Sequence, residues 1–377
     1  MSDELARLLN LELAWGRVRD DLENRVFVRH PYEMDLIEID RDSWLSDRQA
    51  SIRSGGYFPS AMIVCDVPKA KGGIRPGAHL QATDRLVYAA CVGACLENVH
   101  AEIRWAQGVV DFAYQLAATP RERKWLRSQF AGWEEFRECS LRKLEEGFPY
   151  VVITDISAFY DNIDVATLIS DLRQIGVPQA LIDQIGRCLN RWGLIQGRGI
   201  PQGQGASDIL AKLYLNSVDK NLRALGYQHY RYVDDFRIFC RDKAHARKAI
   251  MELTQLLRQR GLTLQTAKSE IYTADEARER IEGVLPILKS VARQFVAQVV
   301  QAAGVGNPYM TVPRAEEILL QNPTDAPLEL IRSAYKAYIV ESDNSTFNST
   351  LFRFLLNRLA AGRDRFAQQD CVPLPIC

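Results

Sequence analysis

The stretch that constrains this chain most runs from His229 to Cys240 and reads HYRYVDDFRIFC. Aromatic and β-branched residues, which favour extended strands, lie on both sides of two adjacent aspartates, Asp234 and Asp235. This pattern predicts a β-hairpin with the aspartate pair at its tight turn. Because two neighbouring carboxylates repel each other, the pair makes sense if a cation lies between them and a third carboxylate. A solvated turn also tolerates two aspartates, so the pair alone leaves both interpretations open.

The overall composition says less about the function of the chain than this motif does. The chain has 377 residues, a length typical of two or three domains, and its 47 basic residues balance its 47 acidic ones. A nucleic-acid partner therefore has to be argued from local patches of charge.

No apolar run approaches membrane-spanning length and the first residues are polar and acidic, so the sequence predicts a cytoplasmic location and no membrane partner. The eight cysteines form no CxxC pair, which favours buried reduced thiols over a zinc site.

Two upstream stretches supply further chemical groups. A nearly continuous β-branched strand begins at Tyr150 and ends at Asp155, where a catalytic or metal-binding carboxylate is expected, with a helix N-cap as the structural alternative. Residues 197–207 form a glycine-rich loop that leads into a long apolar helix from Asp208. Such a junction can offer backbone N–H groups to phosphates. The loop is neither a Walker loop nor a Rossmann turn, because the required lysine and glycine spacings are absent.

A basic turn lies earlier in the chain. A short apolar strand begins at Met62 and leads into a turn that contains glycine, lysine and arginine. The cations of this turn, which can contact phosphates, are Lys69, Lys71 and Arg75. An ordinary basic surface turn is the alternative. Residues 100–147 are expected to be helical and rich in tryptophan, and the chain from about residue 278 onward is expected to form helices interrupted by prolines.

Taken in order, these motifs resemble those of the reverse transcriptases, and among them the bacterial abortive-infection and defence-associated ("unknown group") branch. The resemblance covers about residues 60–275. The segment DISAFY at 155–160 is similar to the first catalytic motif of the family, GIPQG at 199–203 to the second and YVDD at 232–235 to the third. Lys268 falls where the fourth motif has a lysine. The basic turn is similar to the fingers motif that meets the incoming triphosphate.

The resemblance implies a metal-dependent catalytic centre. Asp155 and Asp234 are expected to bridge two divalent ions, Mg²⁺ or alternatively Mn²⁺, with Asp235 more peripheral and the backbone carbonyl of Ile156 as an extra ligand. Such ions clamp the attacking 3′-hydroxyl and the leaving pyrophosphate oxygens, and Mg²⁺ prefers carboxylate, carbonyl and water oxygens. Lys268 is expected to protonate or to stabilise the departing pyrophosphate.

The resemblance also implies a set of contacts to the incoming nucleotide. Tyr160 is expected to exclude ribonucleotides by a clash with the sugar 2′ position, which predicts the use of deoxynucleotides. Gln202 and Gly203 are expected to lie near the sugar and base. Charge on the triphosphate would be neutralised by the cations of the basic turn, Lys69, Lys71 and Arg75.

The implied fold is α+β, the right-hand polymerase arrangement of fingers and palm found in reverse transcriptases, with an α-helical C-terminal region in place of a standard thumb. The expected divisions are an N-terminal helix and fingers with a helical insertion over 1–150, a palm with the catalytic motifs over 151–277, and an α-helical C-terminal domain over 278–377.

The implied function is that of an RNA-directed DNA polymerase in antiphage defence. Its expected partners are an RNA template, such as a dedicated noncoding RNA, the DNA product and deoxynucleotides, with self-association or a partner protein through the helical C-terminal region. One alternative is a template-independent or protein-primed nucleotidyltransferase that uses the same site. Another is a catalytically idle palm that binds nucleic acid, which the presence of all three aspartates disfavours.

Overall fold

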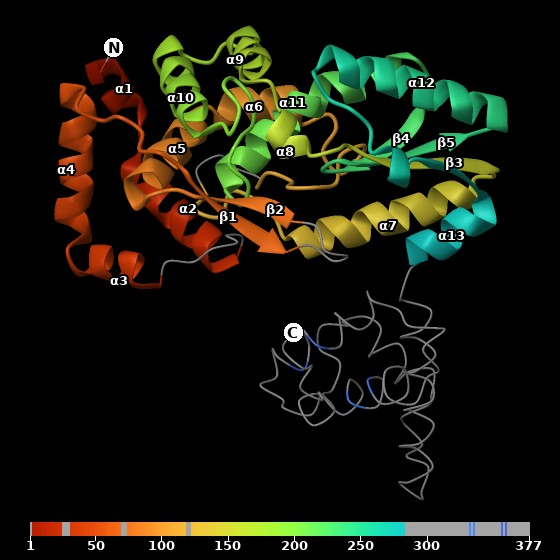
Figure 1. The fold of residues 1–377 in the computed structure, drawn as a ribbon, viewed down its shortest axis with the longest axis horizontal. Coiled ribbons are helices and arrows are strands. Elements are labelled where there is room, and N and C mark those ends of the chain that lie inside the picture. Colours follow the sequence, from red (N-terminus) through yellow and green to blue (C-terminus); the bar gives the residue numbers. More distant parts are fainter. Residues whose placement is uncertain are drawn as a thin grey trace, which may run out of the picture. The chain divides into compact units, whose positions relative to one another are not determined.

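The computed structural model describes residues 2–24, 31–68, 74–117 and 122–282, together with residues 332, 335, 356 and 359. The chain divides into two units, residues 1–278 and 279–377. Figure 1 shows the first of them as a mixed arrangement of helices and two small sheets. Apart from its first residues and four single positions, the predicted helical region 278–377 lies outside the described residues. The expected divisions of the first unit stay predictions.

Four helices open the chain. They are α1 (Ser2–Leu8), α2 (Leu11–Asn24), α3 (Pro31–Ile39) and α4 (Arg41–Ser54). Asn10 separates the first two, because its side-chain Oδ1 accepts a hydrogen bond from the backbone N–H of Leu13 at 2.9 Å and so caps the start of α2. Helix α4 ends at Gly55, whose φ of 76° is the left-handed conformation that glycine adopts without strain.

The next segment is a two-stranded hairpin followed by helices. Strands β1 (Ile63–Pro68) and β2 (Ile74–His79) pair antiparallel, and helices α5 (Ala82–Ala94) and α6 (Leu96–Ile103) follow. Residues 84–92 of α5 are all buried, so this helix forms the centre of the first unit. Helices α2, α10 (Gln179–Trp192) and α11 (Gly205–Ala224) pack around it. The predicted phosphate-binding residues Lys69 and Lys71 follow β1 in the sequence and lie outside the described residues.

The larger sheet has four antiparallel strands in the order β4-β5-β3-β6. They are β3 (Tyr150–Asp155), β4 (Gln228–Tyr232), β5 (Asp235–Cys240) and β6 (Glu270–Thr273). The predicted hairpin is confirmed, since β4 and β5 pair directly and meet at the aspartate pair. The predicted strand that ends at Asp155 is the inner strand β3.

Helices cover both faces of this sheet. Every residue from Phe236 to Cys240 is buried, and successive strand side chains point to opposite faces, so neither face of β5 is open to solvent. In Figure 1, α12 (Lys243–Gln259) lies on one side of the sheet and α7 (Gln129–Glu145) on the other, and both helices contact β5. None of the helices in the described ranges is long and apolar enough to cross a membrane.

The remaining described elements are three α-helices and one 3₁₀ turn. Helices α8 (Phe159–Asn162) and α9 (Val165–Gln174) follow β3, a single 3₁₀ turn (Thr266–Lys268) precedes β6, and α13 (Ala274–Glu282) follows it. The long helix predicted after the glycine-rich loop is confirmed as α11, which begins at Gly205. Helices α9 and α10 lie between β3 and this loop. Helix α12 follows the hairpin.

The predicted helical insertion over 100–147 is only partly correct. Helices α6 and α7 account for its two ends, but the described residues between them are extended and turned, with bridges from Asp111 to Arg231 and from Leu116 to Leu126. The backbone N–H of Arg231 donates to the carbonyl of Val110 at 2.7 Å, so this segment adds to the edge of β4. Burial of Asp111 against Arg231 outweighs the local helical pattern.

Candidate active site

The hairpin turn that carries the aspartate pair has an unusual backbone. Tyr232 and Asp235 are paired across the two strands, so Val233 and Asp234 are the two central residues of the turn. Val233 has a φ of 57°, a left-handed conformation that glycine usually supplies at this position. A β-branched residue there is strained by about 1–3 kcal/mol, and such strain persists only where surrounding contacts impose it.

The turn brings the three predicted carboxylates to one end of the sheet. Asp155 at the end of β3 lies opposite Asp235 at the start of β5. The backbone N–H of Ile156 donates to the carbonyl of Asp234 at 3.2 Å, which fixes the turn against the residue that follows β3. The structure therefore gathers side chains that are up to 80 positions apart in the sequence, as the pairing of two sheet strands requires.

These aspartates line a cavity of about 520 Å³. The other predicted site residues that line the same cavity are Arg75, Ile156, Tyr160, Gln202, Gly203 and Lys268. Nine of the eleven predicted residues are thus brought together, and the other two, Lys69 and Lys71, lie outside the described residues. The cavity is also lined by Tyr114, Gln129 and Asp208, which the sequence analysis did not single out.

The carboxylates shape the electrostatics of the cavity. Burial, followed by the negative charges of Asp155 and Asp235, raises the pKa of Asp234 from an ordinary value of 3.8 to about 7. The ammonium group of Lys268 forms an ion pair with the Asp155 carboxylate. This hydrogen bond raises the pKa of Lys268, so the lysine stays charged at neutral pH.

The three aspartate carboxylates and the Ile156 carbonyl are oxygen ligands of the type that hard divalent cations such as Mg²⁺ and Mn²⁺ accept. The raised pKa of Asp234 reports an excess of negative potential that a cation in this cluster would offset. Within the described ranges, no three His, Cys, Asp or Glu side chains converge closely enough to hold an ion as they stand. Oδ2 of Asp155 is paired with the Lys268 ammonium group, so this oxygen is shared between the lysine and any ion that binds there.

Tyr160 is held firmly in the wall of the cavity. Its hydroxyl donates a hydrogen bond to Oδ1 of Asp208 at 2.6 Å, and its ring packs edge-on against Phe159 with centroids 5.4 Å apart. Burial and the neighbouring Asp208 charge raise the pKa of Tyr160 well above its ordinary value, so the hydroxyl remains a donor. Asp208 lies in the first turn of α11, and the signal that could have found it is an acidic residue directly after the glycine-rich loop.

The glycine-rich loop is anchored from both sides. The backbone N–H of Ile200 donates to the carbonyl of Tyr160 at 3.0 Å, which joins the loop to α8. At the loop's end, the backbone N–H of Gly205 donates to Oδ2 of Asp21 on α2 at 2.8 Å. A Cβ atom at Gly205 would lie only 2.7 Å from Oδ1 of Asp21, so no larger residue fits there without movement. Asp21, which the sequence analysis missed, therefore fixes where α11 begins.

The chain was compared with protein-family models, curated proteins and solved structures. The family model described as reverse transcriptase (RNA-dependent DNA polymerase) matches residues 67–302. A comparison with curated proteins gives no match.

Several solved structures are similar at low sequence identity. Apo telomerase from Candida tropicalis, truncated from its C-terminal domain, is 13% identical over 56% of this chain and 50% of its own, with a TM-score of 0.41. A partial Cas6-RT-Cas1–Cas2 complex is 19% identical over 68% of this chain and 41% of its own, with a TM-score of 0.38. Telomerase from Candida albicans with a TWJ fragment of telomeric RNA is 12% identical over 85% of this chain and 63% of its own, with a TM-score of 0.44. The chain thus spans half or less of the first two of these proteins.

Proposed function

The chain belongs to the reverse transcriptase (RNA-dependent DNA polymerase) family, whose model covers more than half of it, and on this premise we propose that it is an RNA-directed DNA polymerase. The observation that carries the proposal is the convergence of Asp155, Asp234 and Asp235 on one cavity. The cavity also contains a charged lysine and the end of a glycine-rich loop.

In this proposal the carboxylates hold the reacting groups through divalent ions. Asp155 and Asp234 would bind two ions, Mg²⁺ or Mn²⁺, with the carbonyl of Ile156 as a further ligand and Asp235 at the periphery. The bound ions would stabilise negative charge on the attacking 3′-oxygen and on the leaving pyrophosphate. Burial, followed by repulsion from Asp155 and Asp235, raises the pKa of Asp234, and this supports the assignment because a bound ion would favour the charged carboxylate.

Lys268 would act on the leaving group. In the free site its ammonium group is paired with Asp155, and its raised pKa keeps it protonated. When a nucleotide fills the cavity, we propose that the ammonium leaves Asp155 and contacts the departing pyrophosphate. There it would stabilise the developing negative charge or donate a proton.

The remaining cavity residues would select the nucleotide. The Tyr160 ring, fixed by Asp208, would clash with a ribose 2′-hydroxyl and so favour deoxynucleotides. Gln202 and Gly203 would contact the sugar and base. Arg75 on β2, together with Lys69 and Lys71, would neutralise the triphosphate; Arg75 lines the cavity, which supports its part in this role.

The biological setting is also a proposal. We propose antiphage defence, with a dedicated noncoding RNA as one candidate template, because the motifs resemble those of the defence-associated branch. Self-association or a partner protein bound through the region 278–377, and a cytoplasmic site of action, stay predictions of the sequence.

The proposed activity can be tested by primer extension. The purified chain would be given Mg²⁺, labelled deoxynucleotides and a DNA primer, either annealed to an RNA template or alone, beside an Asp234→Asn variant of matched shape. We expect DNA whose sequence copies the RNA, with none from the variant. Product without a template would instead indicate a template-independent transferase. Equal product from the variant would show that the activity comes from elsewhere.

A further inference from the structure

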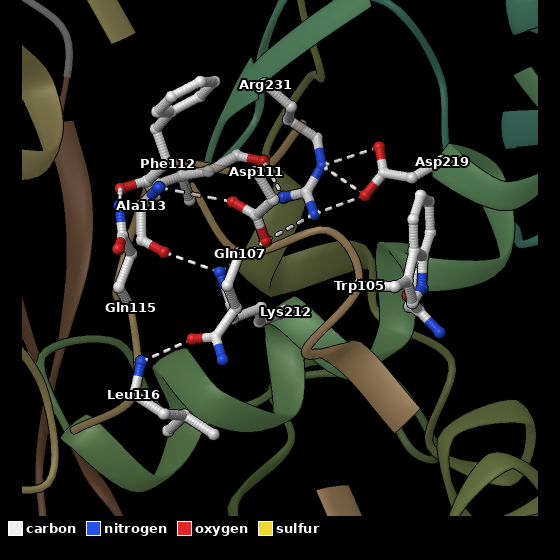
Figure 2. A network of polar contacts seen from close by, with 12 residues as sticks. Trp105, Gln107, Asp111, Phe112, Ala113, Gln115, Leu116, Lys212, Asp219 and Arg231 are labelled. Atoms are coloured by element: carbon white, nitrogen blue, oxygen red, sulfur yellow. Dashed lines mark hydrogen bonds and ion pairs between the residues drawn. The ribbon is translucent and has the colours of Figure 1, made fainter. Parts of the chain in front are cut away.

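A buried network of charges is joined to the hairpin turn by a hydrogen bond from Arg231 to Val233. Figure 2 shows Arg231 bonded to both Asp111 and Asp219 in this network. The Arg231 side chain is 2% exposed. Its Nε and Nη2 donate to Oδ2 of Asp219 at 3.0 and 2.7 Å, and its Nη2 also donates to Oδ2 of Asp111 at 2.8 Å. Its remaining terminal nitrogen, Nη1, donates to the backbone carbonyl of Val233 at 2.9 Å.

The partners of Arg231 come from distant parts of the chain. Asp219 lies on α11, and Asp111 lies in the extended segment that adds to the edge of β4. Lys212 on α11 donates to Oδ2 of Asp111 at 2.6 Å and to the carbonyl of Ala113 at 2.7 Å. Nε2 of His229 is 3.2 Å from Oδ1 of Asp219. Two buried carboxylates are thus compensated by an arginine and a lysine, as buried charges require.

The charged forms of Asp219 and Arg231 are favoured, whereas burial lowers the pKa of Lys212. Burial alone would raise the pKa of Asp219, but the Arg231 charge and the hydrogen bonds from His229 and Arg231 outweigh it and lower that pKa to about 2. Burial likewise opposes the charge on Arg231, but Asp111 and Asp219 raise its pKa above the ordinary value. The guanidinium and the Asp219 carboxylate therefore both stay charged at neutral pH, which preserves the ion pair between them.

A network that served only stability would need no bond to the turn. Buried ion pairs are weak determinants of stability, and well-packed apolar residues often replace them without loss. Here, however, the guanidinium is oriented by two carboxylates so that its Nη1 meets the carbonyl of Val233, the residue with a φ of 57°. That carbonyl belongs to the peptide bond that leads into Asp234.

Only a thin layer of side chains separates the network from the active-site cavity. A small cavity is lined on one side by Asp111, Lys212 and Arg231. The residues that line both this small cavity and the active-site cavity are Tyr114, Phe159, Val233 and Asp208. A shift of the guanidinium would therefore reach the turn without passing through any other element.

We propose that Arg231 is a positioning residue that holds Val233 in its left-handed conformation and so directs the Asp234 carboxylate into the active-site cavity. Asp111 and Asp219 orient the guanidinium for this task. The inference rests on the proposed function, in that Asp234 is taken as a metal ligand. Loss of the bond to Val233 allows the turn to relax and moves the Asp234 carboxylate away from Asp155.

The decisive variant is Arg231→Lys. A lysine keeps the buried positive charge, so Asp111 and Asp219 stay compensated, but a single ammonium cannot replace the planar fork that reaches both carboxylates and the carbonyl of Val233. A matched control is Arg260→Lys. Arg260 makes the same kind of pair with Asp171, donating from Nη1 to Oδ1 at 3.1 Å, and lies outside the residues that line the active-site cavity.

Four measurements would be made on each full-length variant: thermal stability, kcat and KM for a deoxynucleotide, Mn²⁺ binding to the metal-free protein by electron paramagnetic resonance, and amide hydrogen exchange across the hairpin. For Arg231→Lys we expect kcat and Mn²⁺ affinity to fall by about 10- to 100-fold, as for other residues that orient metal ligands. We expect KM to change little and exchange at Val233 and Asp234 to quicken. Arg260→Lys should change thermal stability alone.

A double variant separates positioning from general loss of structure. Glycine adopts a positive φ without strain, so Val233→Gly removes the conformational preference that Arg231 opposes. The double variant Arg231→Lys/Val233→Gly should therefore lose less activity and Mn²⁺ affinity than the product of the two single effects. If Arg231→Lys does not fold, Asp219→Asn provides the same comparison, because it retains an acceptor while loosening the guanidinium.

The proposal is overturned if Arg231→Lys matches Arg260→Lys in Mn²⁺ affinity and hairpin exchange, or if the effects of the double variant simply multiply. The positioning role of Arg231 and the proposed polymerase function can fail separately. Absence of polymerase activity in the wild-type chain would remove the proposed function, whereas the exchange experiment would still report whether Arg231 holds the turn.

Discussion

Replacement of Asp234 by asparagine should stabilise the metal-free protein at high pH. Asp234→Asn preserves the shape of the side chain and removes its charge, which burial and the charges of Asp155 and Asp235 oppose. In the folded protein the pKa of Asp234 is about 7, against an ordinary value of 3.8. The folded state therefore binds this proton more tightly than the unfolded state, and the free energy of unfolding falls as the pH rises from about 4 to 7.

The size of the effect follows from the two pKa values. A difference from 3.8 to about 7 corresponds to about 4 kcal/mol at 1.36 kcal/mol per pH unit. Because the Asp234 side chain is partly exposed, solvent reduces the expected gain to about 2–3 kcal/mol at pH 8. At pH 4 the wild-type carboxyl is already protonated in the folded state, so the two proteins should be nearly equally stable.

Urea unfolding of both proteins in EDTA, at pH values from 4 to 9, would measure this difference. The gain of Asp234→Asn should grow between pH 4 and pH 7 and then level off. Addition of Mg²⁺ at pH 8 should stabilise the wild-type protein and reduce the advantage of the variant. A variant that is less stable at every pH, or a difference that does not change with pH, would refute the claim that burial and the neighbouring carboxylates disfavour the charge of Asp234 in the folded site.

Further predictions concern the other cavity residues and the start of α11. Lys268→Met removes the proposed proton donor and should lower kcat by about 100-fold in single-nucleotide incorporation assays, so a loss below about threefold would contradict the role of Lys268. Tyr160→Ala should raise the incorporation of ribonucleotides relative to deoxynucleotides by about 10- to 100-fold, measured as a ratio of kcat/KM values. Asp208→Asn should raise it less, and an unchanged ratio in both variants would show that Tyr160 does not select the sugar. Gly205→Ala places a Cβ atom against Asp21 and should destabilise the protein by about 1–3 kcal/mol, whereas an unchanged melting temperature would mean that the start of α11 is not tightly fixed.

The parts of the fold that were predicted correctly depend on local patterns. The hairpin, the strand that ends at Asp155 and the long helix α11 all follow from runs of a few residues whose periodicity and turn residues agree. The order of the motifs then identified which carboxylates would meet. The pairing of β3 with β5, which places Asp155 opposite Asp235, agrees with that expectation.

The parts that were missed depend on contacts between distant residues. The segment around Asp111 reads as helical by itself, but its backbone follows the edge of β4 because the buried Asp111 pairs with Arg231, 120 positions later. Asp208 and Asp21 reach Tyr160 and Gly205 across 48 and 184 positions. The place of Asp208 after the glycine-rich loop could have marked it as a candidate, but a single sequence gives no signal for which distant residue each of these side chains contacts.

The central claim is that the three aspartates together drive nucleotide transfer, and single-turnover incorporation of one deoxynucleotide on an RNA-templated DNA primer tests it most directly. The rate would be measured over a range of Mg²⁺ concentrations for the wild-type chain, Asp155→Asn and Asp234→Asn. We predict incorporation by the wild-type chain that depends on Mg²⁺ and on the template, and a loss of at least about 1,000-fold in either variant. Incorporation by either variant at close to the wild-type rate, with all proteins folded, would contradict the central claim.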